Sequence, residues 1–486
     1  MAAVELGVDL SALIDAVLSG DNASVVSRTR SLLEQERNAD VLLGRIGLLA
    51  SKGDPEGHVT ITLAAAAMLA RFLRARPAPL DTEVPPQTRA LPLFIRALIT
   101  AGPAIRNGKN KTIVPPPAIF PSAFIKQDKS VNQALNDAIS QNDAVMVERL
   151  LLGLYGTGAD YRALQIRAYE SISTTFTNGG HPLQDTARGF QLLDAVEWGK
   201  EVPTLLHWLA PQLPVNPGKP EPEWIQTVRN YTADPKHSLA SIRTRLSAPK
   251  NAHALPLRDI ILSDADTATI CEQVYTALIA QEATPIAVAA VTSLAAAQIV
   301  QSVADDDRDL FIRTAHGLLF ASAAHNVYHQ VQDVEAYNLV FTAAAYINTL
   351  FKETTALGKT PTQPQHIEIA STSAGTVGGG GFIAVNQLEA LEEELTNKDL
   401  HAATNTAQRY LMLGHDPRAL FGTIGLVAAQ NDTTIDQGHS LQIVQAAGEE
   451  YITWPRDLKS TKVNVYLHIA LRAAAFGKRD ALISQL

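Results

Sequence analysis

Residues 438–442 read Gly-His-Ser-Leu-Gln (GHSLQ), and residues 180–184 read Gly-His-Pro-Leu-Gln (GHPLQ). The Gly-His pair occurs a third time as Gly57-His58, and Ala315-His316 differs from it by one methyl group. An apolar run with helical spacing stands before each histidine, and another follows it. The pattern therefore predicts a chain of repeated helical hairpins, with a histidine at the start of one helix in each.

The spacing of the four histidines indicates an internal duplication. The step from His58 to His181 and the step from His316 to His439 are both 123 residues long, and the step between them is 135. The string D-x-R-A-L also occurs twice, at residues 160–164 and 416–420, ahead of the second and fourth histidines. We therefore expect two pseudo-symmetric halves, residues 1–245 and 246–486, packed around a central site.

Composition limits the classes of function. The chain has 486 residues, with 46% hydrophobic and 18% charged residues, which is an ordinary globular balance. A formal net charge of −9 does not favour binding to nucleic acid or to an anionic membrane surface. The one cysteine, Cys271, excludes a disulfide framework, a zinc ribbon or an iron–sulfur cluster within one chain. No positive charge precedes Arg28, so we expect no targeting peptide and a cytoplasmic protein.

The pattern along the chain predicts an all-α fold. Alternating strand patterns are nearly absent, and the runs at residues 59–76, 183–197, 317–328 and 440–452 follow the four histidines. The apolar stretch 285–304 contains Thr and Gln residues, so we expect a buried helix rather than a membrane span. Pro-rich connectors are expected at residues 102–124 and 211–222, and a Gly-rich loop or lid at residues 358–382.

The four histidines are candidate metal ligands. Histidine is the commonest metal ligand, and equivalent positions in four repeats allow the four imidazoles to meet at one point. Without carboxylate or thiolate ligands, such a set suits iron, copper, zinc or nickel better than magnesium or calcium. The alternative is that Gly-His is only a loop-to-helix cap inherited with the repeat. Both interpretations stay open from the sequence.

Three further histidines have simpler interpretations. His325 and His329 are one helical turn apart, which allows chelation, but a polar face turned to solvent is the favoured interpretation. His325 follows His316 by nine residues and so lies on the opposite face of that helix. His207 lies in an apolar run and is expected to be a hydrogen-bonded core residue. The sequence contains no phosphate-loop, G-x-S-x-G or H-E-x-x-H motif.

The placement of His58, His181, His316 and His439 resembles the questin-oxidase-like family of fungal polyketide enzymes. The resemblance covers most of the chain and implies a non-haem iron oxygenase that uses dioxygen to hydroxylate and cleave the ring of an aromatic polyketide such as an anthraquinone. It also implies a carboxylated lysine as a fifth ligand. We assign that role to Lys352, as metal ligand and catalytic residue, with Lys200 as the second choice; an exposed lysine stabilised at a helix C-terminus is the alternative for Lys352. No Cys-x-His pair is present, so a built-in Rieske cluster is excluded.

Two other functions stay open. The wider family suggests a flavin-free Baeyer–Villiger-type oxidation that uses a reduced nicotinamide, NADPH. The helical repeat alone would suit a metal-free scaffold that binds a partner protein. The expected partners of the lead interpretation are a small aromatic polyketide and dioxygen, with neither nucleic acid nor membrane.

Overall fold

The computed structural model describes residues 9–483 except 36–37, 79–85, 125–128, 159–160, 215–220, 241, 243–248, 332, 358–380, 433–435 and 459–462. Within these residues the secondary structure is helical, without strands. The all-α prediction is therefore confirmed. The Gly-rich stretch expected to form a loop or lid lies almost entirely outside the described residues.

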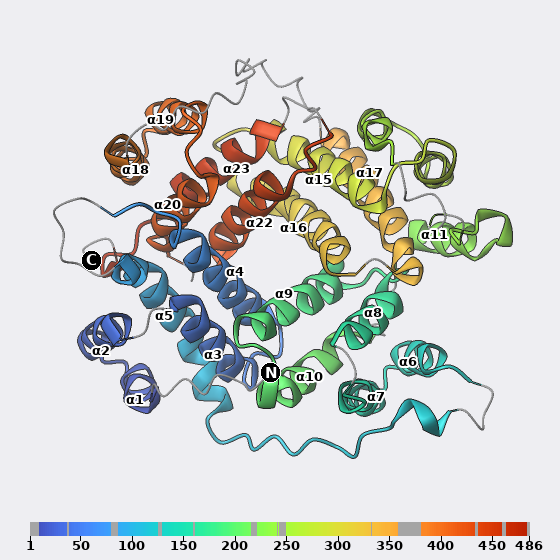
Figure 1. Ribbon diagram of the computed structural model, residues 1–486, viewed down its shortest axis with the longest axis horizontal. Coiled ribbons are helices and arrows are strands. Elements are labelled where there is room, and N and C mark those ends of the chain that lie inside the picture. Colours follow the sequence, from blue (N-terminus) through green and yellow to red (C-terminus); the bar gives the residue numbers. More distant parts are fainter. Residues whose placement is uncertain are drawn as a thin grey trace.

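Four helices form an inner ring around the middle of the molecule (Figure 1). They are α4 (His58–Leu73), α9 (His181–Ala195), α16 (Arg308–Gln330) and α22 (His439–Thr453). Each packs against the next in that order, and α22 closes the ring by packing against α4. In this arrangement α9 lies opposite α22, and each of the four helices carries one of the four histidines.

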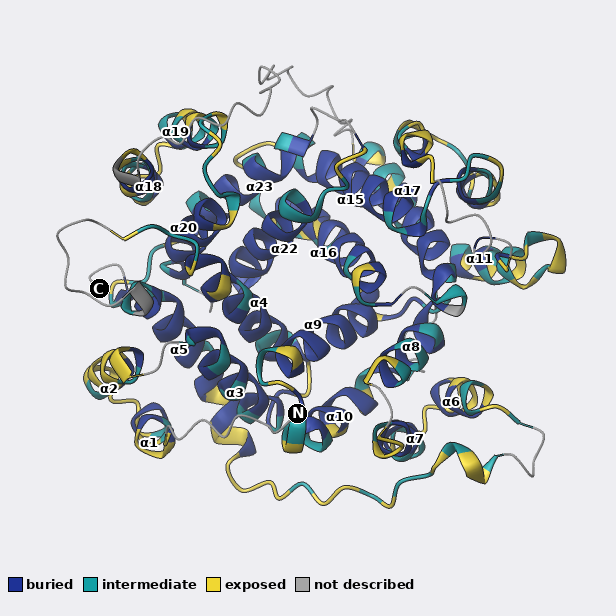
Figure 2. Cartoon of the chain, in the orientation of Figure 1, coloured by how far each residue is buried: buried dark blue, intermediate teal, exposed yellow. Residues whose placement is uncertain are grey.

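A second layer of helices packs on the outside of the ring. Figure 2 shows that exposed residues are concentrated outside this second layer. This layer comprises α3 (Ala39–Ser51), α5 (Leu91–Gly108), α8 (Tyr161–Ile172), α10 (Val202–Leu209), α15 (Pro285–Ser302), α17 (Asn338–Ala356), α20 (Pro417–Ala429) and α23 (Asn464–Phe476). The other α-helices of the described residues cover this layer: α1 (Ser11–Ser19), α2 (Asn22–Gln35), α6 (Val131–Ser140), α7 (Ala144–Gly156), α11 (Glu223–Ala233), α13 (Leu257–Ile261), α14 (Thr267–Tyr275), α18 (Gly381–Thr396) and α19 (Leu400–Met412).

Helix α15 is the apolar stretch expected to be buried. It begins after Thr284, whose hydroxyl accepts a hydrogen bond from the Ala287 amide at 3.2 Å and so caps the helix. Among the described residues it alone is long and apolar enough to cross a membrane, yet 78% of it is buried among the other helices. The burial is what the sequence predicts for a core helix.

One predicted helix start is wrong, and the reason is a single methyl group. Helices α4, α9 and α22 begin at their histidines, each after a glycine with a φ of 83°, 86° or 80°. A residue with a β-carbon rarely adopts this left-handed conformation. Ala315 instead stays helical, so α16 begins at Arg308 and runs straight through His316.

Other differences lie in the connections. Helix α5 continues through Pro103 to Gly108, beyond the expected start of a Pro-rich connector. Helix α11 follows the second connector and was not expected. A 3-10 turn at Asn251–Ala254 and the short helix α13 lie ahead of α14. The hydrophobic core includes residues from both expected halves, and the division at residue 245 stays a prediction.

Candidate metal centre

The four histidines lie together at one end of the inner ring. The ring centroids of His58 and His181 are 4.8 Å apart, and those of His316 and His439 are also 4.8 Å apart. The remaining sides of the quadrilateral are wider, at 5.9 Å from His181 to His316 and 6.1 Å from His58 to His439. The fold therefore brings together residues that are up to 381 positions apart in the sequence.

These distances can be compared with those around a shared metal ion. With a metal–nitrogen bond of ~2.1 Å, two imidazoles at 90–110° on one metal have centroids about 4.6–5.4 Å apart. The two short sides of the quadrilateral fall in this interval, and the two long sides exceed it by about half an ångström. Accordingly, no three His, Cys, Asp or Glu side chains among the described residues have donor atoms already in a metal-binding arrangement.

His439 has the environment of a preorganised ligand. Its Nδ1 lies 2.5 Å from the main-chain carbonyl oxygen of Asp436, which accepts a hydrogen bond from the Nδ1–H group. Nε2 then carries the lone pair, and it is buried without a hydrogen-bond partner among the described residues. A carbonyl that fixes the tautomer from behind is a common feature of metal-binding histidines.

Burial favours the neutral form of His316 and His439, which is the form that binds metal. Burial, followed by the charges of His439, His181 and His58, lowers the pKa of His316 from 6.5 to about 3. Burial also lowers the pKa of His439, and the hydrogen bond with Asp436 opposes that shift. At neutral pH His316 and His439 thus offer ring nitrogens rather than imidazolium charges.

The glycines before the histidines fix the spacing of the ring. A β-carbon on Gly57 would lie 2.5 Å from Asp185 Oδ1, and a β-carbon on Gly180 would overlap the ring of Phe320. In the same way, one on Gly438 would overlap Thr62. Each of these three contacts falls four residues after the histidine of the neighbouring inner helix. This shared register shows that the three Gly-His turns occupy equivalent places in the ring.

Acidic residues at the helix starts belong to the site and were not predicted from the sequence. Asp436 accepts hydrogen bonds from the Gly438 amide at 2.9 Å and from the Ser440 amide at 3.1 Å. Asp54 accepts hydrogen bonds from the Thr60 amide at 2.7 Å and hydroxyl at 2.8 Å. The sequence does contain a signal that could have predicted these two residues. Each is an aspartate three or four residues before the histidine of a Gly-His pair, and carboxyl groups in such places cap helix N-termini.

Asp185 is a third buried carboxyl group in this region. Its Oδ1 faces Gly57 and has no hydrogen-bond partner among the described residues. Burial and then the charge of Asp54 raise the pKa of Asp185 well above its usual value, and burial also raises the pKa of Asp54. Burial thus favours the neutral form of Asp185, which lies close to the turn that carries His58.

No protein-family model matches this chain, and no match was found among curated proteins or solved structures.

The lysines considered as a fifth ligand lie in other surroundings. Lys352 Nζ donates a 2.7 Å hydrogen bond to the main-chain carbonyl of Ala265, between α13 and α14. Lys200 is exposed in the short turn before α10. The ring contacts that unite the four histidines involve neither lysine, and the assignment of Lys352 stays a prediction.

Two other histidines differ from the sequence interpretation. His329 is exposed, but the expectation that His325 meets solvent is wrong: its side chain is 1% exposed, and its Nδ1 lies 2.9 Å from Glu450 on α22. Helix α16 packs against α9 and α22 of the ring and against α15 and α17 outside it, so its face away from His316 is buried as well. His207 is hydrogen-bonded as expected, at 3.0 Å from Glu148, but it is 47% exposed and therefore not in the core.

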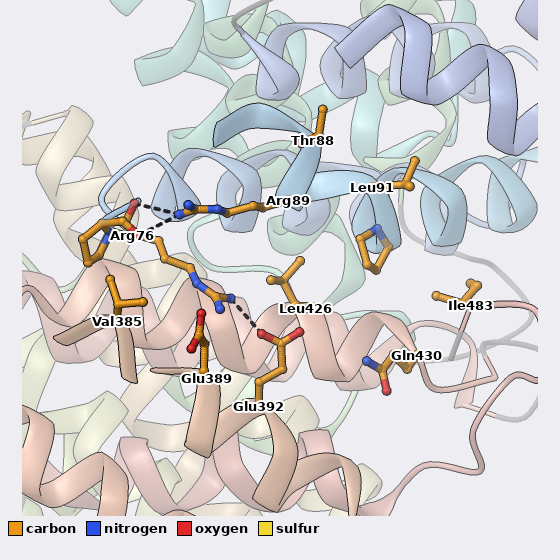
Figure 3. Close-up of a pocket in the computed structure, with 12 residues that line it drawn as sticks. Arg76, Thr88, Arg89, Leu91, Val385, Glu389, Glu392, Leu426, Gln430 and Ile483 are labelled. Carbon is orange, nitrogen blue, oxygen red and sulfur yellow. Dashed lines mark hydrogen bonds and ion pairs between the residues drawn. The ribbon is translucent and has the colours of Figure 1, made fainter. Parts of the chain in front are cut away.

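The charged side chains that line a peripheral pocket already pair with other groups of the protein. Its volume is about 290 Å³, and it lies between the end of α4, the start of α5, and α18 and α20 (Figure 3). Arg76 Nη1 contacts Glu392 at 2.9 Å, and Arg89 donates to the main-chain carbonyls of Arg76 and Pro77. These contacts tie α18 to the ring, and they leave the histidine cluster as the better candidate for chemistry.

Proposed function

We propose that this protein is a non-haem iron-dependent oxygenase of aromatic polyketides, and that His58, His181, His316 and His439 hold the iron. The observation that carries the proposal is the meeting of four imidazoles from four helices, two of them with a lowered pKa. A structural role alone would be served at lower cost by apolar side chains, because burying polar groups is unfavourable.

The donor set fits a late first-row transition metal. The four histidines supply only imidazole nitrogens, which suits iron and disfavours magnesium or calcium. Bound iron would supply positions for dioxygen and substrate that the protein ligands leave open. Asp436 would orient His439 through its carbonyl.

An aromatic cluster beside His181 supports an aromatic substrate. Phe176 lies 5.6 Å from Phe320 and 4.4 Å from Tyr346, measured between ring centroids, and Trp224 stacks at 6.2 Å from Tyr346. Phe176 and Phe320 pack directly against Gly180, the residue before His181. Trp224 and Tyr346 are half-buried on α11 and α17, and rings of this kind are the surfaces on which a planar aromatic molecule would stack. The choice of an anthraquinone rests on the resemblance to the questin-oxidase-like family.

Metal analysis tests this proposal. Protein expressed in iron-replete medium is expected to hold about one iron per chain, and His439→Ala should lose most of it because three imidazoles cannot keep the same geometry. His401→Ala is the matched control, since His401 is exposed on α19. An iron-free wild-type protein, or His439→Ala with full iron content, would overturn the proposal. With metal present, consumption of dioxygen and of a hydroxyanthraquinone then tests the reaction.

A further inference from the structure

Helix α16 carries a second pair of neighbouring imidazoles, His325 and His329. Their ring centroids are 4.8 Å apart, with the ring planes inclined at 55°. This separation equals the short sides of the four-histidine cluster, and it lies within the interval of about 4.6–5.4 Å for two imidazoles on one metal ion. His325 follows His316 by nine residues, which is about 14 Å along the helix, so the pair is separate from the cluster.

A carboxylate holds the inner histidine of this pair. His325 Nδ1 lies 2.9 Å and 3.1 Å from the two carboxylate oxygens of Glu450 on α22. Ionised carboxylate oxygens only accept hydrogen bonds, so Nδ1 carries the proton and the lone pair of the neutral ring is on Nε2. Metal-binding histidines commonly have such a carboxylate behind the ring, where it fixes the tautomer and makes the ligand more basic.

Two acceptor atoms next to His329 have no donor. His325 Nε2 and Asn326 Oδ1 are buried without a hydrogen-bond partner in the described part of the chain. The two residues are four and three positions before His329, so all three side chains share one face of α16. A buried polar atom without a partner costs about 1–3 kcal/mol. Because both atoms are acceptors, a cation at this face would satisfy them.

The spacing of the two histidines is that of a helical metal chelate. Histidines four residues apart on one helix face hold zinc in the H-E-x-x-H metalloproteases, although this chain has Asn326 where that motif has its glutamate. The ion in such a chelate lies between two rings at the helix surface and needs no enclosed cavity. His329 is exposed in the last turn of α16, so rotation of its side chain opens His325 Nε2 to an ion from solvent.

We propose that His325 and His329 chelate a divalent late first-row cation, with zinc as its representative. His325 Nε2 and one ring nitrogen of His329 are the ligands, and water completes the coordination. Imidazole ligands favour zinc, copper or nickel over magnesium or calcium. Since Glu450 orients His325 from α22, the ion strengthens the contact between two helices of the inner ring. The site is independent of any metal in the four-histidine cluster.

His329→Gln tests the site with little risk to folding, because His329 is exposed. Wild-type protein dialysed against excess Zn²⁺ and freed of unbound ions is expected to hold one zinc per chain more than His329→Gln. That difference does not depend on what the four-histidine cluster holds. His401→Gln is the matched control, since His401 is an exposed histidine on α19, and it should bind as much zinc as wild type.

Thermal unfolding provides a second measurement on the same samples. An ion that binds only the folded protein raises its Tm, so zinc should raise the Tm of wild type and of His401→Gln more than that of His329→Gln. Equal zinc contents of wild type and His329→Gln, or an equal loss of zinc in His401→Gln, would overturn the assignment. Equal Tm increases in wild type and His329→Gln would do the same. Iron measured before dialysis judges the four-histidine site separately.

Discussion

Gly438 lies directly against Thr62 of the neighbouring inner helix, with no room for a β-carbon. Thr62 Oγ1 also accepts a 2.9 Å hydrogen bond from Gln442 on α22, the helix that begins directly after Gly438. This bond holds Thr62 in place against the glycine. The left-handed φ of 80° and the close approach therefore both require glycine at the turn that presents His439.

Gly438→Ala should consequently destabilise the fold by about 3 kcal/mol or more, the sum of the left-handed backbone cost and local overpacking. Gly414 provides the control, because it has a φ of 74° with nothing within 4 Å of the added carbon. Gly414→Ala should lose only about 1–2 kcal/mol. Urea unfolding measures both; equal losses would show that the contact with Thr62 does not restrict this turn.

Acid should destabilise the metal-free protein through His316. Its pKa is about 3 in the folded protein, against 6.5 when unperturbed, so the unfolded chain binds more protons between these pH values. The stability linked to His316 is complete above about pH 6.5 and decreases as the pH falls towards 3, by a few kcal/mol in order of magnitude. His316→Gln removes this proton uptake, so its Tm should fall less than that of wild type between pH 7 and pH 4. Parallel Tm curves would contradict the lowered pKa.

His325→Ala should be strongly destabilising although His325 is not in the metal cluster. The side chains of His325 and Glu450 are 1% and 2% exposed, and removal of one partner leaves the other buried without its contact. We expect a loss of about 3–5 kcal/mol with iron content retained. Replacing both residues by leucine should cost less than the sum of the single changes, which a double-mutant cycle measures. A loss below about 1 kcal/mol for His325→Ala would contradict the importance of this pair.

Lys352→Met decides whether that lysine is a fifth ligand. Because Nζ donates to the Ala265 carbonyl, we expect Lys352→Met to lose about 1 kcal/mol of stability and to keep its iron. Lys200→Met is the control for removing an exposed lysine. Two results together would instead establish a carboxylated lysine. Lys352→Met would lose its iron, and wild-type protein would lose iron when carbon dioxide is removed and regain it when bicarbonate is added.

The local features of the fold could be predicted from the sequence because they depend on neighbouring residues. Apolar spacing predicted α4, α9, α15 and α22 to within a few residues, since one face or the whole of each helix is buried. Glycine predicted three helix starts, and the same reasoning explains why Ala315 does not start a fourth. The repeated Gly-His pair also identified the four histidines as a set before their positions were known.

Other features depend on which helices become neighbours, and this cannot be predicted from the local sequence. Closure of α4, α9, α16 and α22 into a ring brings the ring centroids of His58 and His439 to 6.1 Å from each other. It also buries His325 against Glu450 and pairs Arg188 with Glu449. It further buries Asp185 near Asp54, which raises the pKa of Asp185, whereas the sequence shows only an ordinary acidic residue. The sequence by itself determined the all-α class, most of the inner helices and the identity of the four histidines. Only the tertiary structure decided which polar groups are desolvated together, because desolvation depends on packing between distant segments.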